Sequence, residues 1–197
     1  QRASLIGRAT YGYDNRYFAE FSFRVDGSAK FHPDHRWAIF PTISASWVLS
    51  NETFFRNWKQ PVLSNVKFRA STGILGRDGS VKDYSYLLSY IYSPTYGYNI
   101  GGTHHPAIIV ESGNYPNNRL SWEKSRDYNF GIDLGFWDNR FGLTYEYYFR
   151  YRTDMLTDAP DYLYPPSTGT NGSVPLMNFG KLKAWGWDLT LTHRNTI

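Results

Sequence analysis

Two short histidine clusters come closest to the spacing of a metal site. His32-Pro33-Asp34-His35 offers imidazoles beside a carboxylate, and His104-His105 offers two adjacent imidazoles. A protein zinc site uses three or four side-chain ligands in tetrahedral geometry, and neither cluster has a third ligand at a convincing spacing. We therefore interpret both clusters as loop histidines exposed to solvent, and we predict no metal and no other cofactor.

Four carboxylates could in principle act as acid and base, as paired carboxylates do in glycoside hydrolysis. They alternate with apolar residues and are accompanied by basic residues in similar positions. The carboxylates are Glu20, Asp133, Glu146 and Asp188, and the basic residues are Arg8, Arg24, Lys67, Arg69 and Arg150. This mixture favours neutralising pairs between neighbouring strands. Because no phosphate loop, nucleophile elbow or zinc-helix motif is present either, we predict no catalytic residue and no enzyme.

Tyrosines are better candidates for binding, because their flat apolar rings carry a hydroxyl at the rim and can stack on sugars or grip peptides. They are concentrated in two segments between strands: Tyr84, Tyr86, Tyr90, Tyr92, Tyr96, Tyr98 and Tyr115 in the first, and Tyr162 and Tyr164 in the second. The same rings could instead pack the loops together or against a lid protein. Which residues bind substrate is therefore unknown from the sequence.

Seven stretches of alternating apolar and polar residues must position these groups, and none has a charge at its apolar positions. Between Tyr128 and Phe136, for example, every second residue is apolar and the others include Asn129 and Asp133. Such alternation predicts β-strands with one apolar and one wet face. The expected strands cover residues 3–13, 17–26, 36–49, 65–75, 127–137, 140–152 and 183–194. Strands of about 9–11 residues with this period are typical of an outer-membrane barrel wall.

A soluble β-sandwich would also alternate, but three features favour a lipid-facing wall. Sandwich strands average about 5–6 residues, and a charge on a lipid face costs about 2–4 kcal/mol at the bilayer centre. Aromatic residues make up 19% of the chain, with tryptophans near strand ends, as interfacial girdles require. The chain contains no run of 18 apolar residues, so its sequence predicts no membrane-spanning helix. The net charge is +4, and the basic residues are scattered along the chain rather than clustered, which argues against a nucleic-acid partner.

Turn residues predict the topology. Asp14-Asn15 and Asp138-Asn139 favour tight links on the periplasmic side. Residues 76–126 and 154–174 are expected to be large extracellular loops, the first with a hairpin through Tyr84, Tyr86, Leu88 and Tyr90. Ser50-Asn51-Glu52 should cap a short helix, and Pro41 predicts a bulge. Residues 1–197 are expected to be one partial barrel domain: seven strands cannot close an even-numbered barrel, and no signal peptide precedes the first strand.

Several ordered motifs resemble the C-terminal part of the barrel in SusC-like TonB-dependent outer-membrane transporters of the Bacteroidetes. The most specific is Leu120-Ser121-Trp122-Glu123-Lys124. The others are Gly7-Arg8 with Asn15-Arg16-Tyr17, Asp26 to Phe31, Arg36-Trp37 with Phe40-Pro41 and Ala45-Ser46-Trp47, Phe68 to Ser71 with Gly73, Asn129, Gly131, Asp133, Asn139-Arg140, Thr153 to Leu156, Asn178-Phe179-Gly180 and Gly186 to Leu189. One departure is Gly76-Arg77, where the family usually has Gly-Asn.

The resemblance implies a 22-stranded, all-β transmembrane barrel in the bacterial outer membrane, surrounded by lipid, with an N-terminal plug that this chain lacks. It also implies a SusD-like surface lipoprotein as lid, energy supplied through TonB, and import of oligosaccharides or peptides. Two alternatives stay open at this point: a passive porin-type channel, and a soluble carbohydrate-binding β domain without a transport role. The cargo and the oligomeric state are not predicted.

Overall fold

Seven long strands dominate the computed structural model, which describes residues 2–58, 62–79, 81, 83–87, 90–93, 97–106, 109–112, 116–158 and 176–194. The long strands are β1 (Arg2–Tyr13), β2 (Tyr17–Ser28), β3 (Trp37–Val48), β4 (Leu63–Arg77), β9 (Glu123–Phe136), β10 (Phe141–Asp158) and β11 (Leu176–His193). The short elements are η1 (Pro33–His35), η2 (Leu49–Asn51), α1 (Thr53–Asn57), β5 (Tyr90–Ser93), β6 (Gly97–Ile100), β7 (Thr103–Pro106) and β8 (Ile109–Ser112). Within the described part of the chain, no helix is long and apolar enough to span a membrane.

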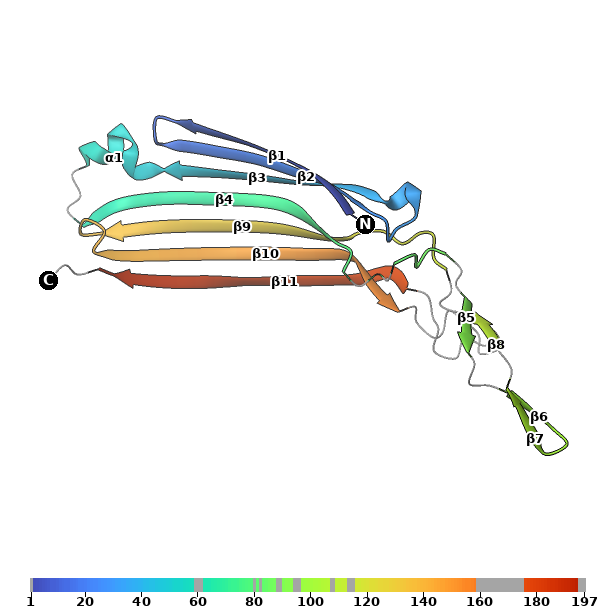
Figure 1. Cartoon of the computed structure of the whole chain (residues 1–197). Coiled ribbons are helices and arrows are strands. Elements are labelled where there is room, and N and C mark those ends of the chain that lie inside the picture. Colours follow the sequence, from blue (N-terminus) through green and yellow to red (C-terminus); the bar gives the residue numbers. More distant parts are fainter. Residues whose placement is uncertain are drawn as a thin grey trace.

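The long strands form one antiparallel sheet in which neighbours in sequence are neighbours in space. Its order is β1-β2-β3-β4-β9-β10-β11, and Figure 1 shows the tight turns and α1 at one end and β5 to β8 beyond the other. The seven predicted strands are confirmed, with ends that differ by a few residues. The largest differences are at the loop end, where β10 continues through residues 154–158 and β11 begins at Leu176, seven residues before the predicted start at 183; these two extensions pair with each other. The remainder of the predicted loop, residues 159–174, lies outside the described residues.

The strand registers place the uncharged positions of all seven strands on one side of the sheet, called the apolar face below. One row across it is formed by residues that pair in succession from β1 to β11: Tyr11, Ala19, Ala45, Ala70, Phe130, Tyr147 and Trp187. Because side chains alternate along a strand, a single register slip would move one strand's apolar residues to the other side. No pair of strands has such a slip within this band.

Exposure is reversed relative to a water-soluble sheet. Trp185 is 68% exposed and Leu191 is 72% exposed on the apolar face, and no second layer of described residues covers them. Along β3, Ile39, Ile43 and Ala45 are exposed, whereas Ser44 and Ser46 on the opposite side are half-buried. Monomeric soluble proteins rarely expose an apolar surface of this extent, so the fold itself is built for an apolar surrounding.

The tight turns use the residues that the sequence predicts. Asp14 and Asn15 have φ of 48° and 51°, and Asp138 and Asn139 have φ of 54° and 63°. Asp and Asn adopt this left-handed region more readily than most residues, because their short side chains can bond to the local backbone. The turns therefore set the two hairpins β1–β2 and β9–β10 at the same end of the sheet.

Three local predictions need correction. Pro41 causes no bulge, since the β2–β3 register runs through it without a shift and the β3–β4 pairing ends at Thr42, so no ladder bond is lost there. The short helix exists, but Glu52 at its N-cap makes no side-chain capping bond. Residues 83–86 form turns rather than a strand. The small hairpin pairings lie instead between β5 and β8 and between β6 and β7.

A compact core lies at the end of the sheet opposite the tight turns. It contains five buried residues from segments far apart in the chain: Phe31, Phe40, Val81, Leu120 and Trp122. Phe40 occupies a position where the alternation of β3 predicts a polar residue, and this core explains its presence, because the β2–β3 connection and residues 116–122 close over its ring. Gly76 adjoins the same ring so closely that a Cβ atom there would overlap it.

Candidate functional site

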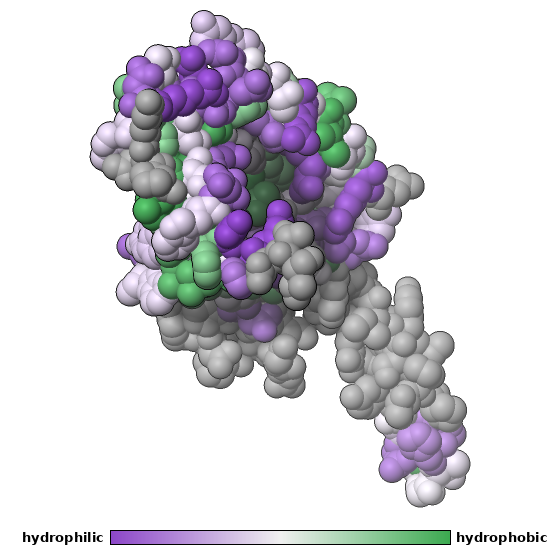
Figure 2. Space-filling view, turned by 90° about the vertical axis from the view of Figure 1, so that its left-hand side faces the viewer, coloured by the Kyte–Doolittle hydropathy of each residue, from purple (hydrophilic) through white to green (hydrophobic). Residues whose placement is uncertain are grey.

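The polar side of the sheet is curved around a hollow. Seen from the end with the tight turns, the molecule encloses a recess with hydrophilic residues around it (Figure 2). A groove of about 560 Å³ runs over this side, and polar residues from six strands line it: Thr10, Glu20, Ser44, Arg69, Asn129 and Glu146. We call this surface the polar face.

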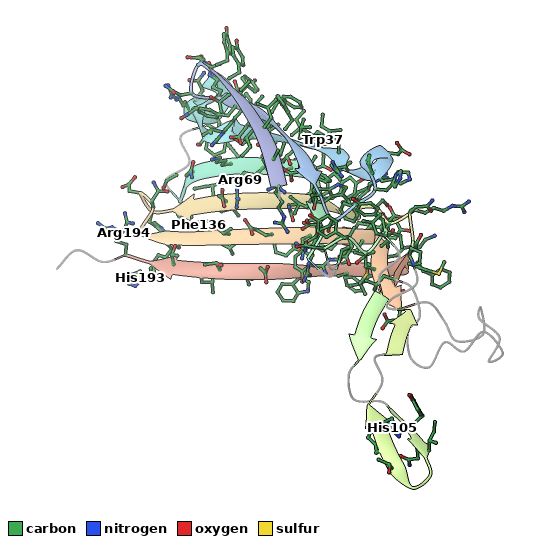
Figure 3. All side chains as sticks on the ribbon, turned by 45° about the vertical axis from the view of Figure 1, so that its right-hand side comes forward. Trp37, Arg69, His105, Phe136, His193 and Arg194 are labelled. Atoms are coloured by element: carbon green, nitrogen blue, oxygen red, sulfur yellow. The ribbon has the colours of Figure 1, made fainter. Side chains whose placement is uncertain are left out.

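Arg69 lies at the centre of the polar face and joins three strands (Figure 3). Its guanidinium donates to both carboxylate oxygens of Asp133, over 2.8 and 3.0 Å, and to Glu146 over 2.6 Å. Thr144 donates to Asp133 over 3.0 Å. Gly131 of β9 pairs with Arg69 of β4. Because glycine has no side chain, the Arg69 guanidinium has room to cross β9 at this position. The arrangement fixes β4, β9 and β10 to one another through charge-assisted bonds.

Two further arginines of the polar face also pair with carboxylates of neighbouring strands, as predicted. Arg150 donates to both oxygens of Asp127 over 3.0 Å, and Arg8 donates to Glu20 over 2.6 Å. Asp188 lies directly opposite Glu146 in the β10–β11 register, but Glu146 is already neutralised by Arg69. Through these contacts, four of the carboxylates of the polar face are each bound to an arginine: Glu20, Asp127, Asp133 and Glu146.

Removing the Arg69 guanidinium should destabilise the complete barrel protein. An Arg69→Met variant leaves Asp133 and Glu146 close together without a cation, which costs roughly 1–3 kcal/mol for hydrogen bonds to charged groups, toward the lower end because water reaches these side chains. Urea unfolding in detergent micelles measures the loss. Adding Asp133→Asn and Glu146→Gln should restore most of it. Arg8→Met, which breaks one exposed pair, is the control, and an equal cost there would contradict a central role for Arg69.

Aromatic rings border the apolar face at the end with the tight turns. Tyr17 stacks between Tyr13 and Trp47, with centroid distances of 6.5 and 6.4 Å. The buried Glu52 carboxylate accepts bonds from the Tyr17 hydroxyl at 2.5 Å and from Trp47 Nε1 at 3.1 Å. The Tyr17 hydroxyl bond is the main cause that holds the pKa of the Glu52 carboxyl below its usual range. The segment between β3 and β4 thus fixes this aromatic border, a role that sequence reasoning missed because it assigned Glu52 to a helix cap.

The histidines of the two clusters show no metal-binding geometry in the part of the chain that the structure describes. His32 and His35 flank and end η1, and His104 bonds Asn99 within the β6–β7 hairpin, where His105 is labelled in Figure 3. Among the described residues, no three His, Asp or Glu side chains lie close enough to hold a metal ion.

The tyrosines are only partly placed. Tyr84 and Tyr98 are exposed, and the Tyr86 ring meets the His32 ring edge-on with centroids 5.7 Å apart. Tyr96, Tyr115, Tyr162 and Tyr164 lie outside the described residues, as do the side chains of Tyr90 and Tyr92. Tyr86 therefore packs one loop against another, as one of the two interpretations of these residues expects, while substrate contact by the others stays a prediction.

Comparison with known proteins places this geometry among outer-membrane receptors. A family model described as TonB dependent receptor-like, beta-barrel matches residues 1–195. The chain is 32% identical over 195 residues to the TonB-dependent receptor SusC of Bacteroides thetaiotaomicron, covering 98% of this chain and 18% of that receptor. It is 28% identical over 192 residues to the TonB-dependent receptor P3 of Formosa agariphila, with the same two coverages.

Solved structures show the same fold. The RagAB peptide importer in its 'closed-closed' state superposes with a TM-score of 0.80 at 26% identity, covering 98% of this chain and 20% of that chain. Its 'open-open' state gives a TM-score of 0.78 at 27% identity, covering 96% and 19%. The chain thus spans about a fifth of the length of these relatives. The part of each relative that it matches is a segment of the barrel wall.

Proposed function

Because this chain belongs to the TonB dependent receptor-like β-barrel family, we propose that it forms part of the wall and outer vestibule of an importer for oligosaccharides or peptides. The apolar face would contact outer-membrane lipid, and the polar face would line the transport path. The observation that carries the proposal is the continuous, uncharged and exposed face on seven paired strands. Such a face is stable only where hydrocarbon covers it.

The two ends of the sheet would have different partners. Tight turns lie at one end, and the connections from β4 to β9 and from β10 to β11 are long, the asymmetry that distinguishes periplasmic from extracellular ends in such barrels. We assign these long connections, residues 78–122 and 159–175, to the outside. There they would meet the substrate and a SusD-like lipoprotein lid. A plug and a TonB-contacting segment would belong to other parts of the complete protein.

The polar face supports a role in positioning rather than in catalysis. Several of its carboxylates are bound by arginines in fixed pairs, as for Arg69 and Arg150, and the chain is similar to a solved peptide importer. We propose no enzymatic activity for this wall. Its charged ladder would instead brace the strands and offer polar contacts to a plug.

Uptake in cells tests the import. Deletion of the gene for the complete protein should abolish accumulation of the labelled oligosaccharide or peptide that wild-type cells take up, and complementation should restore it. Deletion of TonB should have the same effect, because the import would require relayed energy. Continued uptake without TonB would support a passive channel and contradict the proposal.

A further inference from the structure

A row of basic residues borders the apolar face on the side of the long loops. Along the last aromatic row, Tyr128 pairs with Phe149 and Phe149 with Trp185. One step further toward the loops, Arg126 pairs with Tyr151, which pairs with Lys183. Lys124 follows Arg126 on the same side of β9. Arg126, Lys124 and Lys183 therefore continue the apolar face beyond its aromatic border, and we call them the basic row.

The basic row is exposed and lacks carboxylate partners. All three side chains are exposed, and among the described residues none of the three takes part in an ion pair. Their one ring contact is that of Lys183 Nζ with the Tyr151 ring, 5.6 Å from its centroid. Two arginines of the polar face differ from the basic row, since Arg69 and Arg150 are each bound to carboxylates.

The carboxylates next to Arg126 and Lys124 along β9 are bound to other groups on the opposite side of the sheet. Asp127, next to Arg126, accepts both bonds from Arg150. Glu123, next to Lys124, accepts the backbone N–H of Leu156 over 3.0 Å. The alternation of side chains thus separates charge of the two signs across β9, with the cations on the outer side and the anions on the inner side.

We propose that the basic row binds an outer-leaflet lipid whose phosphate headgroup carries a net negative charge, unlike the zwitterionic headgroup of phosphatidylcholine. Guanidinium and ammonium groups are the usual protein donors to phosphate oxygens. The rings of Phe149 and Trp185 mark the depth where headgroups begin, so a phosphate at the row would leave its acyl chains along the apolar face below. The inference rests on the proposed function, which assigns the long loops to the outside.

Lipid selectivity of the complete barrel protein tests this inference. In reconstituted bilayers, electron spin resonance compares how strongly the protein retains spin-labelled phosphatidic acid and spin-labelled phosphatidylcholine with the same chains. The wild-type protein should prefer phosphatidic acid. Since each basic residue near the surface contributes a factor of about five, Arg126→Gln with Lys183→Gln should reduce that preference at least fivefold. Retention of phosphatidylcholine should stay unchanged, which shows that the variant is folded in the bilayer.

Two controls decide the source of any effect. Arg8→Gln with Lys67→Gln removes the same charge from the polar face and should leave the preference intact. Excess glycerol phosphate, which has no acyl chains, should not release the labelled phosphatidic acid. An unchanged preference in the Arg126/Lys183 variant, an equal loss in the polar-face control, or release by glycerol phosphate would each overturn the proposal. Uptake that continues without TonB, for a protein that keeps this lipid preference, would instead count against the importer function alone.

Discussion

Phe130→Arg should destabilise the folded barrel by about 2–4 kcal/mol, the cost of an arginine on a lipid face near the bilayer centre. Phe130 lies on the apolar face in a row with Ala70 and Tyr147, between the rows that contain Ile132 and Tyr128. It is 55% exposed, so the substitution buries nothing and meets no neighbour that could clash. In water, the same exposed change would cost little, which makes the penalty specific to hydrocarbon.

Asn129 offers a matched control, because it is the adjacent residue, is exposed, and points to the polar face. Asn129→Arg should change the free energy of unfolding by no more than about 0.5 kcal/mol. Both variants of the complete protein can be compared by urea unfolding in phospholipid vesicles. Equal behaviour of the two variants would show that water or another protein layer covers the apolar face, and it would end the barrel interpretation.

The seven strands and their inward and outward sides could be predicted because the membrane imposes a rule on single residues. Hydrocarbon excludes charge from every second position, so alternation alone identifies β9 from Tyr128 to Phe136 without knowledge of its neighbours. The tight turns were equally local, since Asp14 and Asn15 favour the left-handed backbone by themselves. Neighbour order then follows from the short links between consecutive strands.

The sequence predicts that charges on the polar face form pairs, but not which residues pair with each other. The sequence places Arg69, Asp133 and Glu146 on the same side of the sheet, but not in contact. Their contact depends on the register of three strands and on Gly131, which leaves space for the guanidinium to pass. Glu52 was misinterpreted for a similar reason: its position before a helix suggested a cap, whereas the folded chain brings it to Tyr17 and Trp47.

The core at the loop end could not be predicted, because its residues come from connections without periodicity. Phe31, Val81 and Leu120 lie in irregular segments. Phe40 occupies a position where the alternation of its strand predicts a polar residue. In the sequence alone, the motif from Leu120 to Lys124 carries the family resemblance but has no evident physical reason. The structure supplies one, since Leu120 and Trp122 fill the core while Lys124 turns outward.

Trp122→Ala should therefore loosen the loop end while the strands of the wall stay paired. Trp122 is 4% exposed, its ring lies 5.3 Å from that of Phe31 and 5.5 Å from that of Phe40, and its Nε1 donates to the Arg36 carbonyl oxygen over 3.0 Å. Loss of a buried tryptophan side chain costs about 3–5 kcal/mol. Because stability is distributed unevenly over a structure, we expect the cost to fall on residues 29–36 and 116–122, where it should raise amide hydrogen exchange by two to three orders of magnitude, since about 1.4 kcal/mol is a factor of ten.

Two further variants separate packing from hydrogen bonding in this core. Trp122→Phe keeps an aromatic ring and loses the bond to Arg36, whose carbonyl oxygen still accepts the Ser28 N–H over 3.2 Å, so it should cost only about 0.5–1.5 kcal/mol, the net contribution of one hydrogen bond. Trp58→Ala removes the same atoms from a side chain that is 63% exposed and should leave exchange at the loop end unchanged. If Trp122→Ala behaves like Trp58→Ala, the ring does not hold the β2–β3 connection against β9. A local effect confined to the loop end would instead show that the wall and the vestibule it carries are separate units of stability, so that the loops can vary or move without opening the barrel.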